Sequence, residues 1–180
     1  SEMINALSNS NNLSIFKPMI EMNNKDDYIV KLSANKGDFF FEKNQFDLSE
    51  RISVNIIKDK KEIDLSAEKV FVDIDKEYLS STNLKLNHNE ITFSGREVSL
   101  SDEFISMSGN PIIFSKKDTF EGYSNEIRID LKKNLLYLSG RSNILIDGKD
   151  ITGEEIIFDY SNNSILNSEN LRIKSGNSWT

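Results

Sequence analysis

The sequence predicts an all-β protein built from about five stacked repeats. One observation is local: apolar residues recur at every second position in stretches such as 127–131 and 135–138, which is typical of half-buried strands. The other is a long-range period. The anchor positions Glu42, Asp73, Ser101, Asp130 and Asp159 are separated by 31, 28, 29 and 29 residues. A fixed interval of this size is typical of repeat architectures, in which each unit buries its apolar face against its neighbours.

Each repeat has the same internal plan. Around Asp130, apolar residues occupy the positions three and one before (Ile127 and Ile129) and six after (Leu136). Four repeats also carry a small residue six before the anchor: Ala67, Gly95, Ser124 and Gly153. Small side chains permit sharp backbone bends, so we expect a corner of the chain at these positions.

In chain order, we expect residues 1–14 to be a flexible arm and residues 15–175 to form a single domain. The domain begins with strands over 15–22 and 28–32, around a polar turn at 23–27, and the first repeat opens at Phe39. Farther along, short separate strands are expected over 127–131, 135–140 and 143–148. Residues 176–180 are expected to fray. No stretch has a convincing helical period.

Composition excludes several classes of protein. The 22 basic and 29 acidic residues leave a net charge of -7, which argues against nonspecific nucleic-acid binding. No uninterrupted apolar run is long enough to span a bilayer as a helix. The chain has no cysteine, so it has neither a disulfide framework nor a thiolate metal site.

Residues that could carry chemistry are sparse. His88, the single histidine, lies in the polar sequence Asn87-His88-Asn89, where a solvated turn residue is the expected interpretation. The anchor carboxylates lack the Gly- and Asp-rich surroundings of calcium loops, so we expect them to point outward at strand ends. With no nucleophile, base or nucleotide-binding loop, the protein is expected to be no enzyme and to need no metal or cofactor.

The apolar face is the informative feature. It could be the dry core of a sandwich, open barrel or solenoid, or it could line an open V-shaped interior that holds a long apolar ligand; periodicity alone fits both. Alternation selects the residues expected to line such a groove: Phe41, Val72, Leu100, Phe114, Ile129, Leu138, Ile144, Ile146 and Phe158.

Several motifs resemble the OstA-like periplasmic lipopolysaccharide-transport family. Residues 109–114 (Gly-Asn-Pro-Ile-Ile-Phe), 126–130 (Glu-Ile-Arg-Ile-Asp), 136–140 (Leu-Tyr-Leu-Ser-Gly) and 151–160 are similar to its bridge protein. Residues 17–20, 27–34, 63–67 and 72–73 are similar to that bridge's membrane-anchored partner. The resemblance covers roughly residues 15–175 and does not separate the bridge, its partner or a merged form.

The resemblance implies a twisted, taco-like β-jellyroll with a hydrophobic groove for lipid A acyl chains. It further implies a lipopolysaccharide bridge across the periplasm, powered by an ATPase elsewhere and assembled by edge-strand pairing among OstA-like proteins or copies of the chain. Residues 15–20 and 171–173 are expected to form the contacts between neighbouring chains of the bridge. Inner- and outer-membrane transport components are further expected partners. An inner-membrane anchor, if any, is expected outside this sequence. The alternative is a structural β-repeat or adhesin module with a dry core and no lipid.

Overall fold

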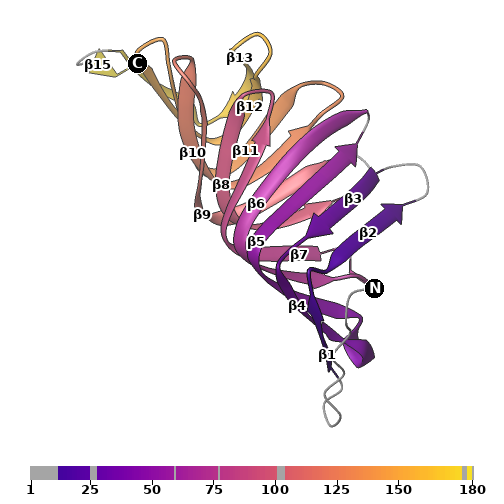
Figure 1. Cartoon of the computed structure of the whole chain (residues 1–180). Helices are drawn as coiled ribbons and strands as arrows, with labels where there is room; N and C mark the ends of the chain where they lie inside the picture. Colours follow the sequence, from indigo (N-terminus) through magenta and orange to yellow (C-terminus); the bar gives the residue numbers. More distant parts are fainter. Residues whose placement is uncertain are drawn as a thin grey trace. The chain divides into compact units, whose positions relative to one another are not determined.

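The prediction of an all-β fold is confirmed. A computed structural model describes residues 12–24, 28–58, 60–76, 78–100, 104–175 and 178–179. Within them, the regular structure is antiparallel strand with one short 3-10 helix, η1 (Phe41–Lys43) (Figure 1). The strands are β1 (Asn12–Phe16), β2 (Met19–Asn24), β3 (Tyr28–Ser33), β4 (Lys36–Phe40), β5 (Gln45–Lys58), β6 (Lys61–Asp73), β7 (Tyr78–His88), β8 (Ile91–Leu100), β9 (Ile105–Lys116), β10 (Phe120–Asp130), β11 (Leu135–Ile146), β12 (Lys149–Asp159), β13 (Ser164–Glu169), β14 (Arg172–Ser175) and β15 (Ser178–Trp179).

The chain divides into two compact units. Unit 1 comprises residues 1–86 and 97–99, and unit 2 comprises residues 87–96 and 100–180, so β7 and β8 contribute to both. Strands of unit 1 are hydrogen-bonded in the order β1-β4-β5-β6-β7, with β3 joining β2 to β5. Strands of unit 2 follow the order β8-β9-β10-β11-β12-β14-β15, with β13 on β12. The predicted single domain and the number of repeats stay predictions.

The chain ends differ in detail from the sequence expectation. Strand β1 begins at Asn12, within the stretch expected to be an arm, and pairs with β4. The strand expected over 15–22 is interrupted, because Lys17 adopts a left-handed φ of 51° and Pro18 follows it. Strand β15 occupies residues 178–179 of the expected frayed end and pairs with β14, whereas residues 1–11, 176, 177 and 180 lie outside the described residues.

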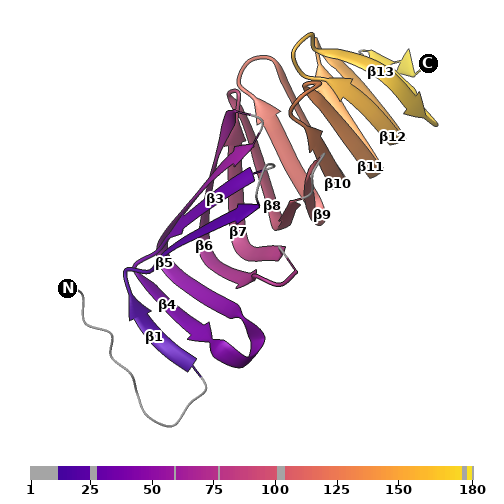
Figure 2. The ribbon, with the colours of Figure 1, turned by 90° about the vertical axis from the view of Figure 1, so that its right-hand side faces the viewer.

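Long strands bend and so belong to two layers. In unit 1, β5 pairs with β4 through residues 45–49 but with β3 through residues 53–58. Between these parts its register with β6 shifts, and Glu50 and Arg51 adopt left-handed φ values of 63° and 52°. A bulge of this kind bends a strand, as the course of β5 and β6 shows (Figure 2). One bent strand therefore serves as the junction between two layers.

Unit 2 repeats this construction. Strand β12 pairs with β14 through residues 149–152 and with β13 through residues 155–159. In β11 the register shifts between Ser139 and Ser142, where Gly140 and Arg141 have φ values of 70° and 53°. The expectation of separate strands over 135–140 and 143–148 was therefore wrong: they are the two arms of one bent strand.

Three of the four predicted corners lie at or beside these bulges. Register shifts follow Ala67 in β6 and Ser124 in β10, and Gly153 pairs with Ser142 beside the shift of β11. Ser124 is fully buried, with its Oγ 2.9 Å from the carbonyl oxygens of Glu126 and Ser139 and 3.0 Å from the Ser142 hydroxyl. Because bulges leave backbone groups without ladder partners, a small buried hydroxyl is well suited to this position.

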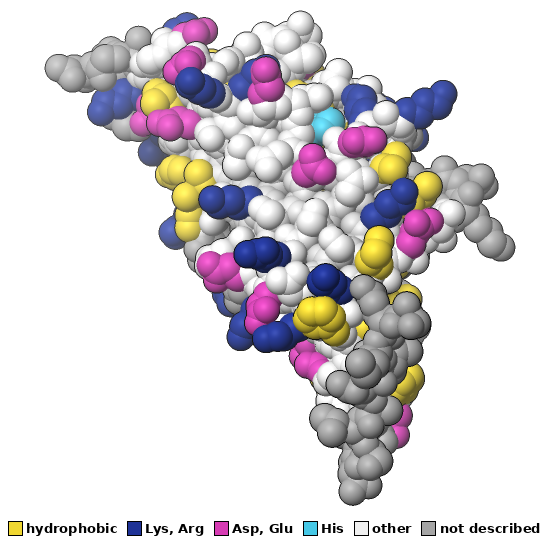
Figure 3. Space-filling model, in the orientation of Figure 1, with side chains coloured by type: hydrophobic (Ala, Val, Ile, Leu, Met, Phe, Trp, Pro, Cys, Tyr) yellow, Lys and Arg dark blue, Asp and Glu magenta, His cyan; other side chains and the backbone are white. Residues whose placement is uncertain are grey.

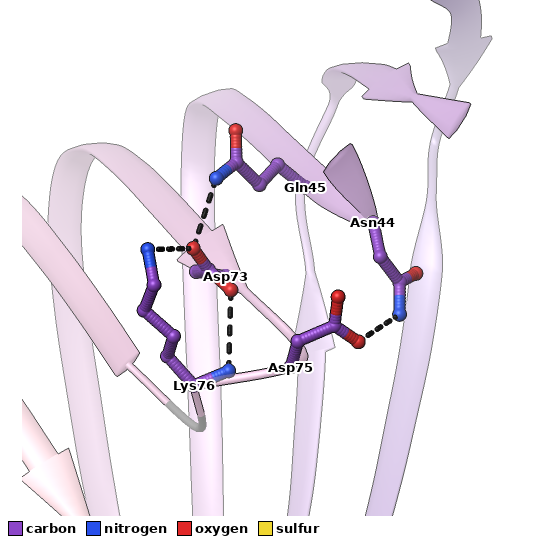
Figure 4. A network of polar contacts seen from close by, with 5 residues as sticks. All are labelled: Asn44, Gln45, Asp73, Asp75 and Lys76. Atoms are coloured by element: carbon purple, nitrogen blue, oxygen red, sulfur yellow. Dashed lines mark hydrogen bonds and ion pairs between the residues drawn. The ribbon is translucent and has the colours of Figure 1, made fainter. Parts of the chain in front are cut away.

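The anchor carboxylates cap turns. Asp73 Oδ1 accepts a hydrogen bond from the Lys76 backbone N–H at 3.2 Å, and its Oδ2 accepts from Gln45 Nε2 at 2.9 Å and Lys76 Nζ at 3.0 Å (Figure 4). Asp130 repeats the pattern, accepting from the Lys133 N–H at 3.0 Å. The expectation that these side chains point outward was wrong for Asp73 and Asp130, which are buried because they satisfy the turn that follows each strand.

Candidate functional site

The inward apolar rows of unit 1 are incompletely covered on one side. Leu13, Phe39, Phe46 and Val72 face one another in register across β1, β4, β5 and β6. Val72 is 1% exposed, whereas the other three side chains are only half-buried. Burial therefore decreases toward β1, the strand that among the described residues pairs with β4 alone.

The second layer of unit 1 follows the same gradient. Met22, Val30, Ile56 and Ile63 form an inward row across β2, β3, β5 and β6. The last three are buried, and Met22 at the edge is half-buried. Both layers thus present apolar side chains at the edge formed by β1 and β2, and this opening is the candidate site.

Aromatic rings concentrate at this opening. Phe39 stacks on Phe46 with ring centroids 4.3 Å apart, and Phe41 contacts Phe39 edge-on at 4.8 Å. Alternation selected Phe41 for the groove wall; it lies in η1 after β4 has ended, its side chain is 58% exposed, and its role in lipid binding stays a prediction. The chain leaves the strand conformation at Phe41, so the two-residue period no longer sets its direction.

The other residues selected by alternation fall into two groups. Those with buried side chains are Val72 in unit 1 and Phe114, Ile129, Leu138, Ile144, Ile146 and Phe158 in unit 2. The Leu100 side chain lies outside the described part of the structure. A role of these residues in lipid binding stays a prediction. The sequence pattern missed the half-buried aromatic and aliphatic residues at the β1 and β2 edge, because a two-residue period does not indicate which strand lies at an edge.

Side chains fill the interior of unit 2 at these positions. Phe120, at the start of β10, contacts Phe158, near the end of β12, with ring centroids 4.9 Å apart and an interplanar angle of 82°. The two rings come from different layers, since one precedes the corner of its strand and the other follows it. Phe114 and Phe158 are fully buried, so unit 2 has the packed core of an ordinary sandwich here.

His88 is part of a buried polar cluster. The expectation of a solvated turn residue was wrong, because His88 is the last residue of β7 and is 4% exposed. Its Nε2 lies 3.0 Å from Asn89 Nδ2 and 3.4 Å from the Tyr160 hydroxyl, which in turn lies 3.4 Å from Asn134 Oδ1. Burial raises the pKa of Tyr160 to about 12, and the negative charges of Asp130 and Asp159 act in the same direction.

Carboxylates at the turns have lowered pKa values. The pKa of Asp73 is lowered chiefly by the hydrogen bonds from the Gln45 and Lys76 side chains. Hydrogen bonds from Ser161, and then from Asn162, lower the pKa of Asp159 to about 2. These shifts are explained by turn capping and indicate no catalytic acid or base.

A depression of about 640 Å³, lined by both polar and apolar side chains, lies at one end of unit 2. Its wall comes from three turns, at residues 89–90, 117–119 and 147–148, together with the strand ends beside them. Glu90, Asp118, Glu121 and Asp147 outnumber Lys116 and Lys117 in this lining. Turns from separate hairpins meet only in the folded chain, which is why the sequence did not indicate it.

The charged surface is mixed. Basic and acidic side chains are interspersed on the face shown in Figure 3. Among the described residues, no cluster of three or more His, Cys, Asp or Glu side chains could hold a metal ion, and no helix has the length and hydropathy of a membrane span.

Comparison with known proteins gives matches in structure only. No protein-family model and no curated protein matches the sequence. Among solved structures, the chain is similar to LptH of Pseudomonas aeruginosa, described as the LptA homologous periplasmic component of the conserved lipopolysaccharide transport device. The match has a TM-score of 0.48 and 15% sequence identity, and covers 64% of this chain and 82% of that chain.

Proposed function

We propose that the protein is a non-enzymatic lipid-binding component of a periplasmic lipopolysaccharide-transport bridge, and that unit 1 holds acyl chains between its layers. One observation carries the proposal: apolar rows in both layers of unit 1, buried farther inside, are only half-buried at the β1 and β2 edge. The motifs shared with the OstA-like family support the same assignment.

Acyl burial would supply the affinity. Each methylene transferred from water to an apolar interior contributes about 0.8 kcal/mol, so a ten-methylene segment contributes roughly 8 kcal/mol before the loss of chain entropy. The net charge of -7 does not attract an anionic phosphorylated headgroup. Binding should therefore depend weakly on salt, and the headgroup should remain in water.

Edge strands would join the bridge. Among the described residues, β1 pairs with β4 alone and β2 with β3 alone, so each leaves backbone groups available to a neighbouring strand. Exposed apolar side chains flank the terminal strands: Phe16 and Met19 near β1 and β2, and Leu166 and Leu171 near β13 and β14. Other OstA-like bridge proteins or copies of this chain are the proposed partners.

Native mass spectrometry with and without lipopolysaccharide tests the proposal. Phe46→Asp places a charge at the half-buried opening, and Ile113→Asp places the same charge on a 56% exposed side chain of unit 2 as the matched control. We expect a stoichiometric lipid adduct for the native protein and the control, and its loss in Phe46→Asp with an unchanged β-sheet circular dichroism spectrum. No adduct with the folded native protein, or an adduct that survives Phe46→Asp, contradicts the proposal.

A structural β-repeat module is the second candidate. The observation that favours it is the packed interior of unit 2, where Phe120 contacts Phe158. Such a module would bind no lipid at either unit, so the same experiment separates the two functions.

A further inference from the structure

Three large apolar side chains are exposed together on the outward face of unit 2. Ile113 of β9 and Tyr123 of β10 are partners in register and are 56% and 43% exposed. Leu145 of β11, 38% exposed, lies diagonally across from Tyr123, because Tyr123 pairs with Asn143, two residues earlier. Diagonal neighbours on one face of a sheet are within reach of long side chains, so Ile113, Tyr123 and Leu145 form one apolar patch. A contiguous group of this kind commonly marks an interaction site, whereas single exposed apolar residues need no explanation.

The depression at the end of unit 2 adjoins this patch. Leu145 belongs to both, and the buried residues Phe120 and Ile146 add apolar lining at the ends of their inward rows. The volume of about 640 Å³ is that of a cleft that binds a ligand. Patch and depression therefore form one continuous surface with apolar and polar parts.

The charged part of the depression is acidic. Lys116 Nζ lies 3.5 Å from Glu90 Oε2, so these two charges largely neutralise each other. The other carboxylates of the lining form no ion pair within the described part of the chain: Asp118, Glu121 and Asp147. Lys117 is the other basic residue of the lining. The excess of negative charge favours a cationic occupant and disfavours nucleic acid, free phosphate and anionic lipid headgroups.

The acidic turns are regularly spaced. The turns at residues 89–90, 117–119 and 147–148 close the hairpins β7–β8, β9–β10 and β11–β12, which follow one another in the sheet. Because neighbouring strands lie about 4.8 Å apart, successive turns are separated by about 10 Å. A polyproline II helix rises about 3.1 Å per residue with three residues per turn, so every third side chain faces the same way at intervals of about 9 Å. A β-strand does not match, because its residues i and i+3 point to opposite faces.

We propose that the apolar patch and the depression form a docking site for an extended basic segment of a partner protein, with Lys or Arg at every third residue. The cationic groups would lie against the turn carboxylates, and their methylene stems and the apolar residues between them would lie on Leu145 and Tyr123. A second copy of this chain fits less well, because two chains that each carry a net charge of -7 repel each other. The site is on the outward face, so the inference goes beyond the proposed function and does not depend on lipid binding.

Fluorescence anisotropy of a labelled peptide, titrated with the full chain, tests the docking site. The probe is a peptide of repeated Lys-Pro-Leu units, since a residue before proline favours polyproline II. The comparison peptide has the same composition with all its lysines adjacent. Asp118→Asn with Asp147→Asn removes two charges, and asparagine tolerates the left-handed φ values of 55° and 50° at these positions. Glu62→Gln with Glu68→Gln, two exposed residues of β6, is the matched control with the same change in net charge.

We expect the repeated peptide to bind more tightly than the clustered one, with an affinity that falls as salt is added. Asp118→Asn with Asp147→Asn should weaken binding about fivefold, the effect of losing two exposed ion pairs, and the control pair should leave the affinity unchanged. Leu145→Ser should weaken binding about threefold through the loss of apolar contact. Leu166→Ser, at a 58% exposed position of β13, should have no effect.

Several outcomes would overturn the docking site. These are no binding of the repeated peptide, equal affinity for the two peptides, and equal weakening by the two charge-removing pairs, which would show that only net charge matters. Self-association of the chain that Leu145→Ser abolishes would assign the patch to a second copy and also contradicts the proposal. No lipid enters these measurements, so the proposed function stands or falls separately.

Discussion

Gly122 is the position where one methyl group should do the most damage. It lies in an inward row of unit 2 between Phe114 on β9 and Ile144 on β11, both fully buried. A Cβ built on Gly122 would overlap the backbone carbonyl oxygen of Asn143 and would lie 2.6 Å from Cζ of Phe114. The glycine therefore provides the space in which the Phe114 ring crosses β10.

We expect Gly122→Ala to destabilise the protein by about 3 kcal/mol, at the upper end of the usual range for overpacked cores. The overlap with Asn143 involves backbone, which a change of rotamer cannot relieve. At about 2–4 °C per kcal/mol for a chain of this size, the midpoint of thermal unfolding should fall by roughly 6–12 °C.

Gly95→Ala is the matched control. There the nearest atom to the added Cβ is the flexible Cε of Met107, at 3.2 Å, so the side chain can move aside. We expect a change below about 1 kcal/mol, with the lower entropy of the unfolded chain offsetting part of the crowding. Thermal and urea unfolding followed by circular dichroism measure both variants. Equal losses for the two would refute the reasoning, because the rigid backbone contact would then have no special effect.

Three further expectations concern the polar groups of the fold. The pKa of Asp159 in the folded state, about 2, lies below its ordinary value of 3.8, so the carboxylate stabilises the protein above pH 4 and loses this contribution as the pH falls toward 2. In urea unfolding, Asp159→Asn should therefore lower the stability by about 1 kcal/mol at pH 7 and leave it unchanged near pH 2. A loss of stability that does not depend on pH would contradict this. Ser124→Val should cost about 2 kcal/mol, because it removes the hydroxyl partner of a buried corner, whereas a change within 0.5 kcal/mol would show that the corner needs only a small apolar group. The pKa of Tyr160 is raised to about 12, so Tyr160 should stay protonated in the folded state when the pH rises through 10, and its contribution to stability should be lost between about pH 10 and 12. Ultraviolet difference titration, with Tyr160→Phe as the comparison, should show that one fewer tyrosine ionises near pH 10 in the native protein than its tyrosine content predicts. The absence of this deficit would disprove the burial of Tyr160.

The residues that sequence reasoning placed well are those whose neighbours lie on the same strand. Ile129, Leu138 and Ile144 are buried as alternation predicted, because the pleat sends alternate side chains to one face whatever the strand packs against. The small residues at the corners were also recognisable, because only small side chains tolerate the bend at Ser124 and Gly153.

The errors came from residues whose environment depends on partners distant in sequence. His88 lies in a stretch that looks like a polar turn, yet Tyr160, which is 72 residues away, packs on it. Asp73 looks like an exposed strand end, yet Gln45 of the preceding strand and its own turn bury it. A local pattern contains no information about such partners.

By itself, the sequence determined that this protein is built from antiparallel strands with one apolar face and regular corners, because strand pleat and bulge chemistry act over a few residues. Only the tertiary structure decided which apolar rows are closed and which are open. Phe158 is sealed because Phe120 from another strand covers it, whereas Phe39 and Phe46 stay half-buried because the layers of unit 1 end at β1 and β2. Coverage depends on the strand that lies alongside, which is a property of the assembled layers.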